Sequence, residues 1–356
     1  MEYRFLGIEM QSPLIAGSGP LCYGAEGMIR LHRAGAGAVT TKTINLTAAE
    51  NPSPHIAVLG ARSLLNCEKW SDFPPEQWIE QEIPAAKRAG ATVIASVGAS
   101  VLGQPEWIPA LVRAGAGVIE LVSYDEAALA PMAAAFRPFC DVPMLAKLSA
   151  NFGDFMGTAR RCRAAGCDGF TACDSVGPAV AIDIMTGRPV MGAEDGRGWL
   201  SGAAVKPLIL HRILQLRQEF DCPILGLGGI MSWEDCIEFS MAGANALGVC
   251  SAPMLLGTDV LGRLRKGIEA YLESRGYQGL GDICGLTPRL LHTAREFRMG
   301  YDESRCIACG RCVAVCPYRA RALDAPDGEK RMRVDEALCR NCGLCVSVCP
   351  KDCLRE

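Results

Sequence analysis

Two cysteine runs of identical spacing lie near the C-terminal end of the chain. Both follow the pattern C-x2-C-x2-C-x3-C-P, as CIACGRCVAVCP and CRNCGLCVSVCP. Thiolates at this spacing hold 4Fe-4S clusters, and the fourth cysteine of each run ligates the cluster of the other run. The runs therefore predict two 4Fe-4S clusters, one held by Cys306, Cys309, Cys312 and Cys349, and the other by Cys339, Cys342, Cys345 and Cys316.

The alternative for these runs is a pair of zinc sites, because C-x2-C pairs also bind zinc. Four cysteines in each run, with Pro317 and Pro350 after the fourth, favour iron and sulfur over zinc. We interpret Cys353 as a bystander and the cysteines upstream as reduced, mostly buried thiols. Clusters carry single electrons and do no organic chemistry unaided, so they imply a redox group in the rest of the chain.

The elements that would position this group follow a repeated pattern. A helical stretch ends in Ala-Gly and a short apolar run follows, as in Ala34-Gly35 before AVTTK. Five such copies, with three further apolar runs at PLIAG, PMLAKL and PILGLG, give eight candidate strands. Eight parallel βα units in about 250 residues are typical of a TIM barrel. A doubly wound open sheet is the alternative, but GSGPLCYG has the wrong spacing for its dinucleotide fingerprint.

The predicted fold class is therefore α/β, a (β/α)8 TIM barrel followed by a small α+β domain of the bacterial ferredoxin type. We place the barrel at residues 1–280, a linker at 281–300 and the ferredoxin-like domain at 301–356. Composition adds exclusions: the net charge is only -3 and no long basic stretch occurs, so neither nucleic acid nor an anionic membrane is an expected partner. The N-terminal segment lacks the features of a secretory signal and no apolar run could span a bilayer, so we expect a cytoplasmic protein.

Function in such a barrel lies at the carboxyl ends of the strands. Lys42 and Lys147 follow two predicted strands, so both should face the mouth, where they can stabilise negative charge on a cofactor. The alternative is that they are solvated or ion-paired. Gly228-Gly229 before a helix start, together with Ser251 after the next strand, matches the phosphate site that barrels build there, although a tight turn would look the same.

Taken together, these motifs resemble the dihydropyrimidine dehydrogenase family and, in the barrel, the class 1 dihydroorotate dehydrogenases. The match is carried by TKT at 41–43, LLNCE around Asn66, PMLAKLSANFGD, SGAAVKP and GLGGIMSWEDC, and with the cysteine runs it covers the whole chain. The resemblance implies FMN at the barrel mouth, which can couple hydride chemistry to single-electron clusters. The residues implied to bind FMN are Ala16, Gly17, Ser18, Lys42, Thr43, Ser96, Lys147, Gly202, Gly228, Gly229, Cys250 and Ser251.

The chain departs from the family pattern after the fourth strand. In place of N-[LF]-S-C-P it has VSYDE, so the substrate-binding Asn becomes Val122 and the proton-donating Cys becomes Asp125. A second substrate Asn of the family corresponds to Asp174. An unpaired polar group of a buried substrate costs about 1–3 kcal/mol, so a uracil-like substrate is not expected.

The proton donor to a different substrate would then be Asp125 or Tyr124, unless both are ordinary loop residues. Asp125 would need a raised pKa to be protonated at neutral pH. The side chains expected to contact the substrate are Asn66, Asn151, Asp174 and Ser175.

The sequence thus predicts an iron-sulfur flavoprotein oxidoreductase that adds or removes hydrogen across a C=C or C=N bond of a small molecule. Because the chain has no nicotinamide fingerprint, we expect a redox protein partner, either an NAD(P)H-oxidising flavoprotein subunit or a ferredoxin, and a homodimer or hetero-oligomer. One alternative is an electron-transfer subunit of a larger redox complex without its own substrate. Another is a barrel that holds no flavin.

Overall fold

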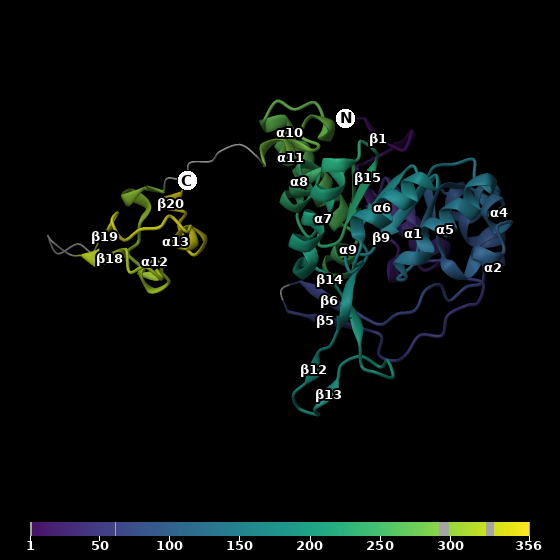
Figure 1. Cartoon of the computed structure of the whole chain (residues 1–356), viewed down its shortest axis with the longest axis horizontal. Helices are drawn as coiled ribbons and strands as arrows, with labels where there is room; N and C mark the ends of the chain where they lie inside the picture. The colour runs from purple at the N-terminus through teal and green to yellow at the C-terminus, as the bar shows by residue number, and fades with distance from the viewer. Residues whose placement is uncertain (1, 61, 292–298, 325–330, 356) are drawn as a thin grey trace. The chain divides into compact units, whose positions relative to one another are not determined.

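The computed structural model describes residues 2–60, 62–291, 299–324 and 331–355. The chain divides into two compact units, residues 1–291 and 292–356 (Figure 1). The larger unit is a closed barrel of eight parallel strands, which confirms the predicted TIM barrel. In chain order the strands are β3 (Leu14–Ala16), β4 (Ala38–Thr40), β7 (Val93–Gly98), β8 (Ala116–Val122), β9 (Met144–Leu148), β10 (Gly169–Ala172), β15 (Ile224–Leu227) and β16 (Ala246–Val249).

Amphipathic helices surround these strands. All five glycines of the Ala-Gly pattern have positive φ, the backbone conformation that ends a helix where a side chain would be strained. The helices of the larger unit are α1 (Gly24–Arg33), α2 (Pro75–Gln77), α3 (Ile83–Arg88), α4 (Trp107–Ala114), α5 (Glu126–Phe136), α6 (Phe155–Ala164), α7 (Lys206–Glu219), α8 (Trp233–Ala242), α9 (Ser251–Leu256), α10 (Val260–Ser274) and α11 (Leu286–Leu290).

The amino-terminal end of the barrel is filled by apolar side chains. The hairpin of β1 (Tyr3–Phe5) and β2 (Ile8–Met10) lies against it, and Phe5 packs with Ile15, Ile94 and Leu225 from the strands. A filled interior leaves no passage at this end. Loops at the carboxyl ends of the strands are therefore the place for a site.

A second sheet, which the sequence analysis did not predict, is built from the long segments after β4 and β10. It is four-stranded, in the order β11-β14-β6-β5, with β5 (Ile56–Leu59), β6 (Ser63–Asn66), β11 (Val176–Ala179) and β14 (Gly198–Gly202). Antiparallel pairing of β6 and β14 sets Asn66 opposite Trp199 and Leu64 opposite Ser201. A small hairpin of β12 (Ile182–Asp183) and β13 (Arg188–Pro189) extends beyond it (Figure 1). The sheet thus joins two barrel loops that lie far apart in the sequence.

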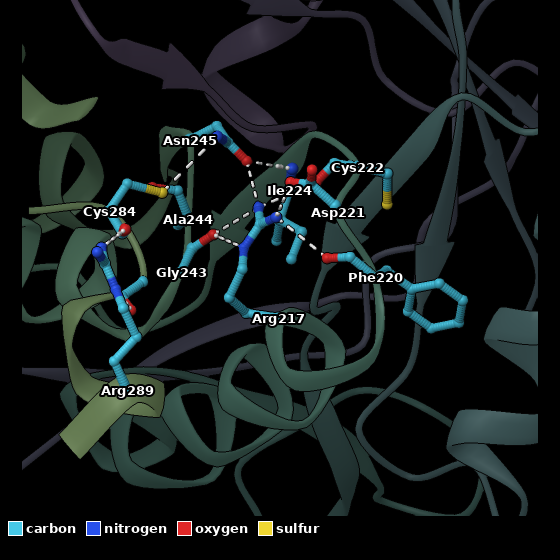
Figure 2. Close-up of polar contacts among 11 residues, drawn as sticks. Arg217, Phe220, Asp221, Cys222, Ile224, Gly243, Ala244, Asn245, Cys284 and Arg289 are labelled. Atoms are coloured by element: carbon cyan, nitrogen blue, oxygen red, sulfur yellow. Dashed lines mark hydrogen bonds and ion pairs between the residues drawn. The ribbon is translucent and has the colours of Figure 1, made fainter. Parts of the chain in front are cut away.

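Arg217, near the end of α7, joins the segments before β15 and β16 (Figure 2). Its guanidinium donates to the carbonyls of Phe220 at 3.1 Å, Cys222 at 2.9 Å and Gly243 at 2.9 and 3.0 Å. It also donates to Oδ1 of Asn245 at 2.6 Å. One planar, five-donor side chain thereby satisfies the carbonyls of two neighbouring βα units.

The segment after α10 continues this packing. Ile283 is fully buried, the Cys284 thiol donates to the Ala244 carbonyl at 3.5 Å, and Arg289 donates to the Cys284 carbonyl at 3.0 Å (Figure 2). The start of the range predicted as linker is therefore packed on the barrel as far as Leu291. The rest of that range, from 292 to 298, lies outside the described residues.

The smaller unit has the predicted ferredoxin-like fold. Its strands are β17 (Gly300–Tyr301) paired with β20 (Leu354–Arg355) and β18 (Arg321–Asp324) paired with β19 (Arg331–Val334). The helices α12 (Arg311–Ala314) and α13 (Leu344–Ser347) each start inside one cysteine run, after a left-handed glycine. Over the described parts of both units, no helix is long and apolar enough to cross a membrane.

Replacing Arg217 by Met should destabilise the barrel by about 2–4 kcal/mol, because several carbonyls lose their donor while the aliphatic packing is kept. Thermal unfolding of the full chain, followed by circular dichroism, measures this as a lower Tm. Arg160→Met is the matched control, since Arg160 loses only an exposed pair with Glu219 and should cost less than about 1 kcal/mol. Equal Tm values for the two variants would contradict the role given to Arg217.

Candidate active site at the barrel mouth

A cavity of about 480 Å³ opens at the carboxyl ends of the strands, beneath the second sheet. Its size lies in the range of cofactor and small-molecule sites. Twelve of the residues predicted for the site line it: Ser18, Lys42, Thr43, Asn66, Tyr124, Lys147, Asp174, Ser175, Gly228, Gly229, Cys250 and Ser251.

Six predicted residues do not line the cavity: Ala16, Gly17, Ser96, Gly202, Asp125 and Asn151. Ala16 ends β3, and the Gly17 N–H donates to the Val249 carbonyl at 2.9 Å in the barrel wall. Ser96 lies beneath the cavity and bonds Thr43 between hydroxyls 3.0 Å apart. Asn151 is exposed and its amide donates to the Gly177 carbonyl.

Lys147, at the end of β9, is buried between two carboxylates. Its Nζ lies 3.6 Å from Asp174 and 3.9 Å from Glu120. Burial alone would lower the pKa of Lys147, but Asp174 and then Glu120 raise it above its ordinary value, so the side chain is a cation at neutral pH. The sequence analysis missed Glu120, which is 1% exposed inside the barrel.

Glu120 is held in place by hydroxyl groups from neighbouring strands. Ser96 donates to its Oε1 at 3.1 Å and Thr171 to its Oε2 at 2.7 Å. Two hydrogen bonds from opposite sides fix the position of this carboxylate. A polar network therefore runs through the barrel interior from Thr43 to Lys147.

Lys42, at the end of β4, has a separate set of partners. Its Nζ lies 2.7 Å from Glu68 and 3.7 Å from Asp72, and it donates to the Lys69 carbonyl at 3.3 Å. All three partners come from the segment between β6 and α2, so the same contacts attach that segment to the barrel. Both predicted lysines are thus ion-paired and still border the cavity.

The loop after β15 brings backbone close to the cavity. Gly229 has φ +101°, and a Cβ there would lie 2.8 Å from the backbone nitrogen of Lys206, so only glycine fits. The hydroxyls of Ser251 and Ser201 are 3.1 Å apart on the adjacent wall. These groups can donate hydrogen bonds to a phosphate.

The start of α8, which the sequence analysis included in the phosphate site, already has an internal acceptor. The Asp235 carboxylate accepts from the Met231 and Ser232 N–H groups, both at 2.8 Å. Lys206 in turn contacts Asp235 at 2.6 Å. The glycines and serines of the cavity wall are therefore better placed for an anion than the helix start.

Three aromatic side chains border the outer part of the cavity. The Tyr124 ring lies 5.3 Å from the Trp199 ring and 6.2 Å from the Trp70 ring, measured between centroids. Gly98 makes room for Trp70, because a Cβ there would lie 2.4 Å from the indole. Sequence reasoning missed both tryptophans, although Trp70 stands four residues after Asn66 and Trp199 just before SGAAVKP.

The two candidate proton donors occupy different environments. Asp125 is exposed and caps α5, where its Oδ1 accepts from the Ala127 N–H at 3.0 Å. An N-cap carboxylate uses its oxygen to accept a backbone N–H of the first helical turn. Tyr124 is 41% exposed but lines the cavity, where the partial burial of its phenol, followed by the negative charge of Asp174, raises the pKa above the ordinary value. Tyr124 therefore lies in the cavity with a protonated phenol, whereas Asp125 does not line the cavity.

Three thiols also border the cavity: those of Cys67, Cys173 and Cys250. Burial raises the pKa of Cys250 to about 11 and that of Cys173 further still. The Cys67 thiol donates to the Pro54 carbonyl at 3.8 Å. Cys173 and Cys250 are therefore neutral at pH 7.

In the smaller unit, a cavity of about 20 Å³ is bordered by Cys306, Cys309, Cys312 and Cys349. The buried Tyr301 hydroxyl beside it finds no hydrogen-bond partner among the described residues. Thiols around a small space with an unused donor fit a sulfur-rich cluster. Across the described ranges, no three His, Cys, Asp or Glu side chains are grouped as ligands of a single metal ion.

The remaining predicted ligands do not border this cavity. Cys316 accepts from the Ala320 N–H at 3.3 Å, and Cys345 lies 3.5 Å from the Arg321 guanidinium. Cys353 lies with its sulfur 3.2 Å from that of Cys349, so it contacts a predicted ligand.

Comparisons with known proteins agree with a redox barrel followed by a 4Fe-4S domain. The dihydroorotate dehydrogenase family model matches residues 115–272, and the 4Fe-4S dicluster domain model matches residues 296–353. The catalytic subunit of dihydroorotate dehydrogenase B (NAD(+)) from Methanothermobacter thermautotrophicus is 30% identical over 298 residues, covering 80% of this chain and 98% of that protein. The Escherichia coli K12 NAD-dependent dihydropyrimidine dehydrogenase subunit PreA is 28% identical over 355 residues, covering 89% and 85%.

Replacing Glu120 by Ala should destabilise the barrel by about 3 kcal/mol or more, because buried Lys147 loses one of its two carboxylates. The pKa of Lys147 should fall, since the charge of Glu120 is one of those that raise it. A lower Tm measures the first effect. Glu106→Ala, at an exposed position, is the control and should change stability by no more than about 0.5 kcal/mol. Equal Tm values for Glu120→Ala and the unsubstituted chain would contradict this account.

Proposed function

Because the chain belongs to the dihydroorotate dehydrogenase family, we propose that its barrel mouth binds FMN and a small unsaturated substrate together. The protein is a flavin and iron-sulfur oxidoreductase that acts on CH-CH groups. The single observation that carries the rest of the proposal is the cavity at the strand ends, in which two buried lysines, a glycine loop and three aromatic rings meet.

FMN fits the inner part of this cavity by the chemistry of its lining. Gly228 and Gly229 present backbone without side chains, and Ser201 and Ser251 present hydroxyls, which together suit the phosphate. Lys42 and Lys147 supply positive charge for the ring system. FMN, when bound, exchanges a hydride with the substrate and passes on electrons singly. Ala16, Gly17, Ser96 and Gly202 would support the cavity from behind it.

The outer part of the cavity indicates the kind of substrate. Asn66 Oδ1 accepts from the Glu68 N–H at 3.0 Å, so its amide NH2 is left to donate to a substrate carbonyl. Asp174 can only accept, so it suits a substrate N–H. Apolar Val122 borders the same space, and the aromatic rings favour a flat partner. We therefore propose a flat conjugated ring with one carbonyl and one N–H, in place of a pyrimidine held by three amides.

Tyr124 is the proposed proton donor. Its hydroxyl borders the cavity and stays protonated at neutral pH, so it can deliver a proton to the substrate carbon next to the one that receives the hydride. Lys147 lies close enough to the phenol to contribute to its electrostatic environment, and its charge would stabilise the phenolate that forms. Ser175 and Asp174 would then hold the substrate, while Asp125 and Asn151 would order their loops.

The two cysteine runs support two 4Fe-4S clusters, which would relay electrons between FMN and a partner protein. The relative from Methanothermobacter is by its name a catalytic subunit, which supports a partner subunit here too. The partner we propose is an NAD(P)H-oxidising flavoprotein or a ferredoxin.

The proposal is tested by anaerobic reduction of the purified chain, followed by addition of conjugated ring carbonyls, cyclic imines and pyrimidines. Reoxidation of the flavin band by a ring with a carbonyl and an N–H supports the enzyme. If no small molecule reoxidises the flavin while a redox protein does, the chain is an electron-transfer subunit instead. A preparation without flavin absorbance overturns the proposal.

Replacing Tyr124 by Phe should lower the rate of substrate turnover at least about 100-fold, because the proton donor is lost while the ring remains. Flavin reduction by the partner should be unchanged. Because the pKa of Tyr124 is raised, unsubstituted protein should keep its turnover as pH rises to 10, with no loss from this group below that value. Stopped-flow absorbance separates the two half-reactions.

Asp125→Asn is the control for this variant, since an Asn still caps α5 and should leave turnover within a few-fold. A larger loss in Asp125→Asn than in Tyr124→Phe would give the proton-donor role to Asp125.

A further inference from the structure

Arg321 is a buried cation whose polar contacts, among the described residues, are to sulfur. It is 5% exposed at the start of β18. Its guanidinium lies 2.9 Å from the Met299 sulfur, 3.7 Å from the Met332 sulfur and 3.5 Å from the Cys345 sulfur. Within the part of the chain that the structure describes, no carboxylate lies within ion-pair distance of it. A guanidinium cannot lose its proton in a protein, so this charge is permanent.

The β18–β19 hairpin directs this side chain inward. In the register of the hairpin Arg321 faces Val334 and Leu323 faces Met332, and side chains two apart along a strand share a face. Arg321, Leu323 and Met332 thus lie on the face that packs on the cysteine runs, which also buries Cys345 and Leu354. The position is a core position of the unit, occupied by a charge.

The other arginines of the hairpin show the contrast. Arg331 pairs with Glu303 and Arg333 with Asp324, each at 3.1 Å and with about half or more of the side chain exposed. These surface pairs keep their charges hydrated. Arg321 is almost fully buried and has no carboxylate partner among the described residues, and thioether sulfur is a weak acceptor. A buried charge without a counter-charge is costly, so the fold must supply one in the assembled protein.

The predicted thiolate ligands are the available negative charges. Cys345 belongs to the second predicted set, with Cys316, Cys339 and Cys342. The backbone N–H of Ala320, the residue before Arg321, donates to Cys316 of the same set at 3.3 Å. Both donors at the start of β18 therefore point to one predicted cluster.

In the first predicted set, no described thiol lies within hydrogen-bond distance of a charged side chain, although the Arg321 charge also acts on Cys312 at longer range. Cys306 accepts from the Ala308 N–H at 3.4 Å, and the neutral Tyr301 hydroxyl lies beside the cavity. A hydrogen bond from a charged donor is stronger than one from a neutral donor. The two sites thus differ in direct hydrogen bonding to Arg321, although the two cysteine runs have the same spacing.

We infer that Arg321 is the internal counter-charge of the second cluster and gives that cluster a higher reduction potential than the first. This inference rests on the proposed pair of clusters. One electron enters the cluster, no bond forms or breaks, and its negative charge grows by one. Arg321 stabilises that added charge and keeps its own proton. Hydrogen bonds to sulfur and nearby charge are the general means by which proteins set such potentials.

The first electron that enters the smaller unit then reduces the second cluster. The second cluster, held by Cys316, Cys339, Cys342 and Cys345, would be reduced first. Electron exchange with the partner and with the flavin would start from that state. The identical spacing of the two cysteine runs gives no indication of this order.

The test is a redox titration of the full anaerobic chain, monitored by electron paramagnetic resonance. Arg321→Met keeps an unbranched side chain and removes the charge. At any fixed potential it should reduce the ratio of reduced to oxidised second cluster at least tenfold, a fall of about 59 mV in its midpoint. The midpoint of the first cluster should move much less. Arg333→Met, on the exposed face of the same hairpin, is the control and should move neither.

Cys342→Ser identifies the second cluster by changing its spectrum, and the midpoint lowered in Arg321→Met must belong to that same signal. Unchanged midpoints, or a fall confined to the other signal, overturn the inference. If Arg321→Met does not assemble its clusters, Arg321→Lys and Arg321→Gln replace it. The Lys variant should hold the midpoint near that of the unsubstituted chain and the Gln variant should lower it. Equal midpoints in these two variants overturn the inference.

Iron analysis separates this inference from the function on which it rests. Two 4Fe-4S clusters require about eight iron atoms per chain. An unsubstituted chain that cannot be loaded to this level overturns the proposed pair of clusters and the inference with it. Full loading with no effect of Arg321 on either midpoint overturns the inference alone.

Discussion

The eight parallel strands of the barrel close on themselves, so all their carboxyl ends meet at one rim and no strand edge is left unpaired. Apolar side chains and the β1–β2 hairpin fill the opposite end, so chemistry is confined to the rim. Closure also brings together residues that are distant in the sequence. Lys42 and Lys147 come from strands far apart in the chain and border one cavity. The cavity, the ion pairs around it and the second sheet above it all depend on this closure.

Charge in the cavity is balanced locally. Lys147 is paired with Asp174 and Glu120, and Lys42 with Glu68 and Asp72, so burial of these cations does not leave isolated charges. The ferredoxin-like unit follows a different rule at Arg321, where the described chain offers only sulfur. In the barrel, carboxylates of the protein balance the buried lysines. In the smaller unit, the charge that would balance the buried arginine is that of the proposed cluster.

The strands of the barrel could be predicted because local signals mark them: an Ala-Gly helix end followed by a buried apolar run. The lysines at the strand ends followed from the same signals. The sheet of β5, β6, β11 and β14 could not be predicted in this way, because its central pairing joins residues 63–66 to residues 199–202 and no local pattern encodes that contact. Glu120 was missed because a charged residue in an apolar strand gives no sign of its partners. Asp125 was named because it stands in place of the family's proton-donating Cys, and that correspondence carries no sign that its carboxylate caps α5.

The inner and outer walls of the cavity come from different parts of the chain. Strand ends and the loops after β15 and β16 supply the inner wall, whereas Asn66 and Trp199 of the outer wall come from two segments whose strands β6 and β14 pair with each other. The strands of these segments form a sheet separate from the barrel, so the outer wall and the barrel strands do not share a hydrogen-bonded ladder. Such an architecture lets a lineage diversify its substrates by revising two surface segments while inheriting the redox core unchanged.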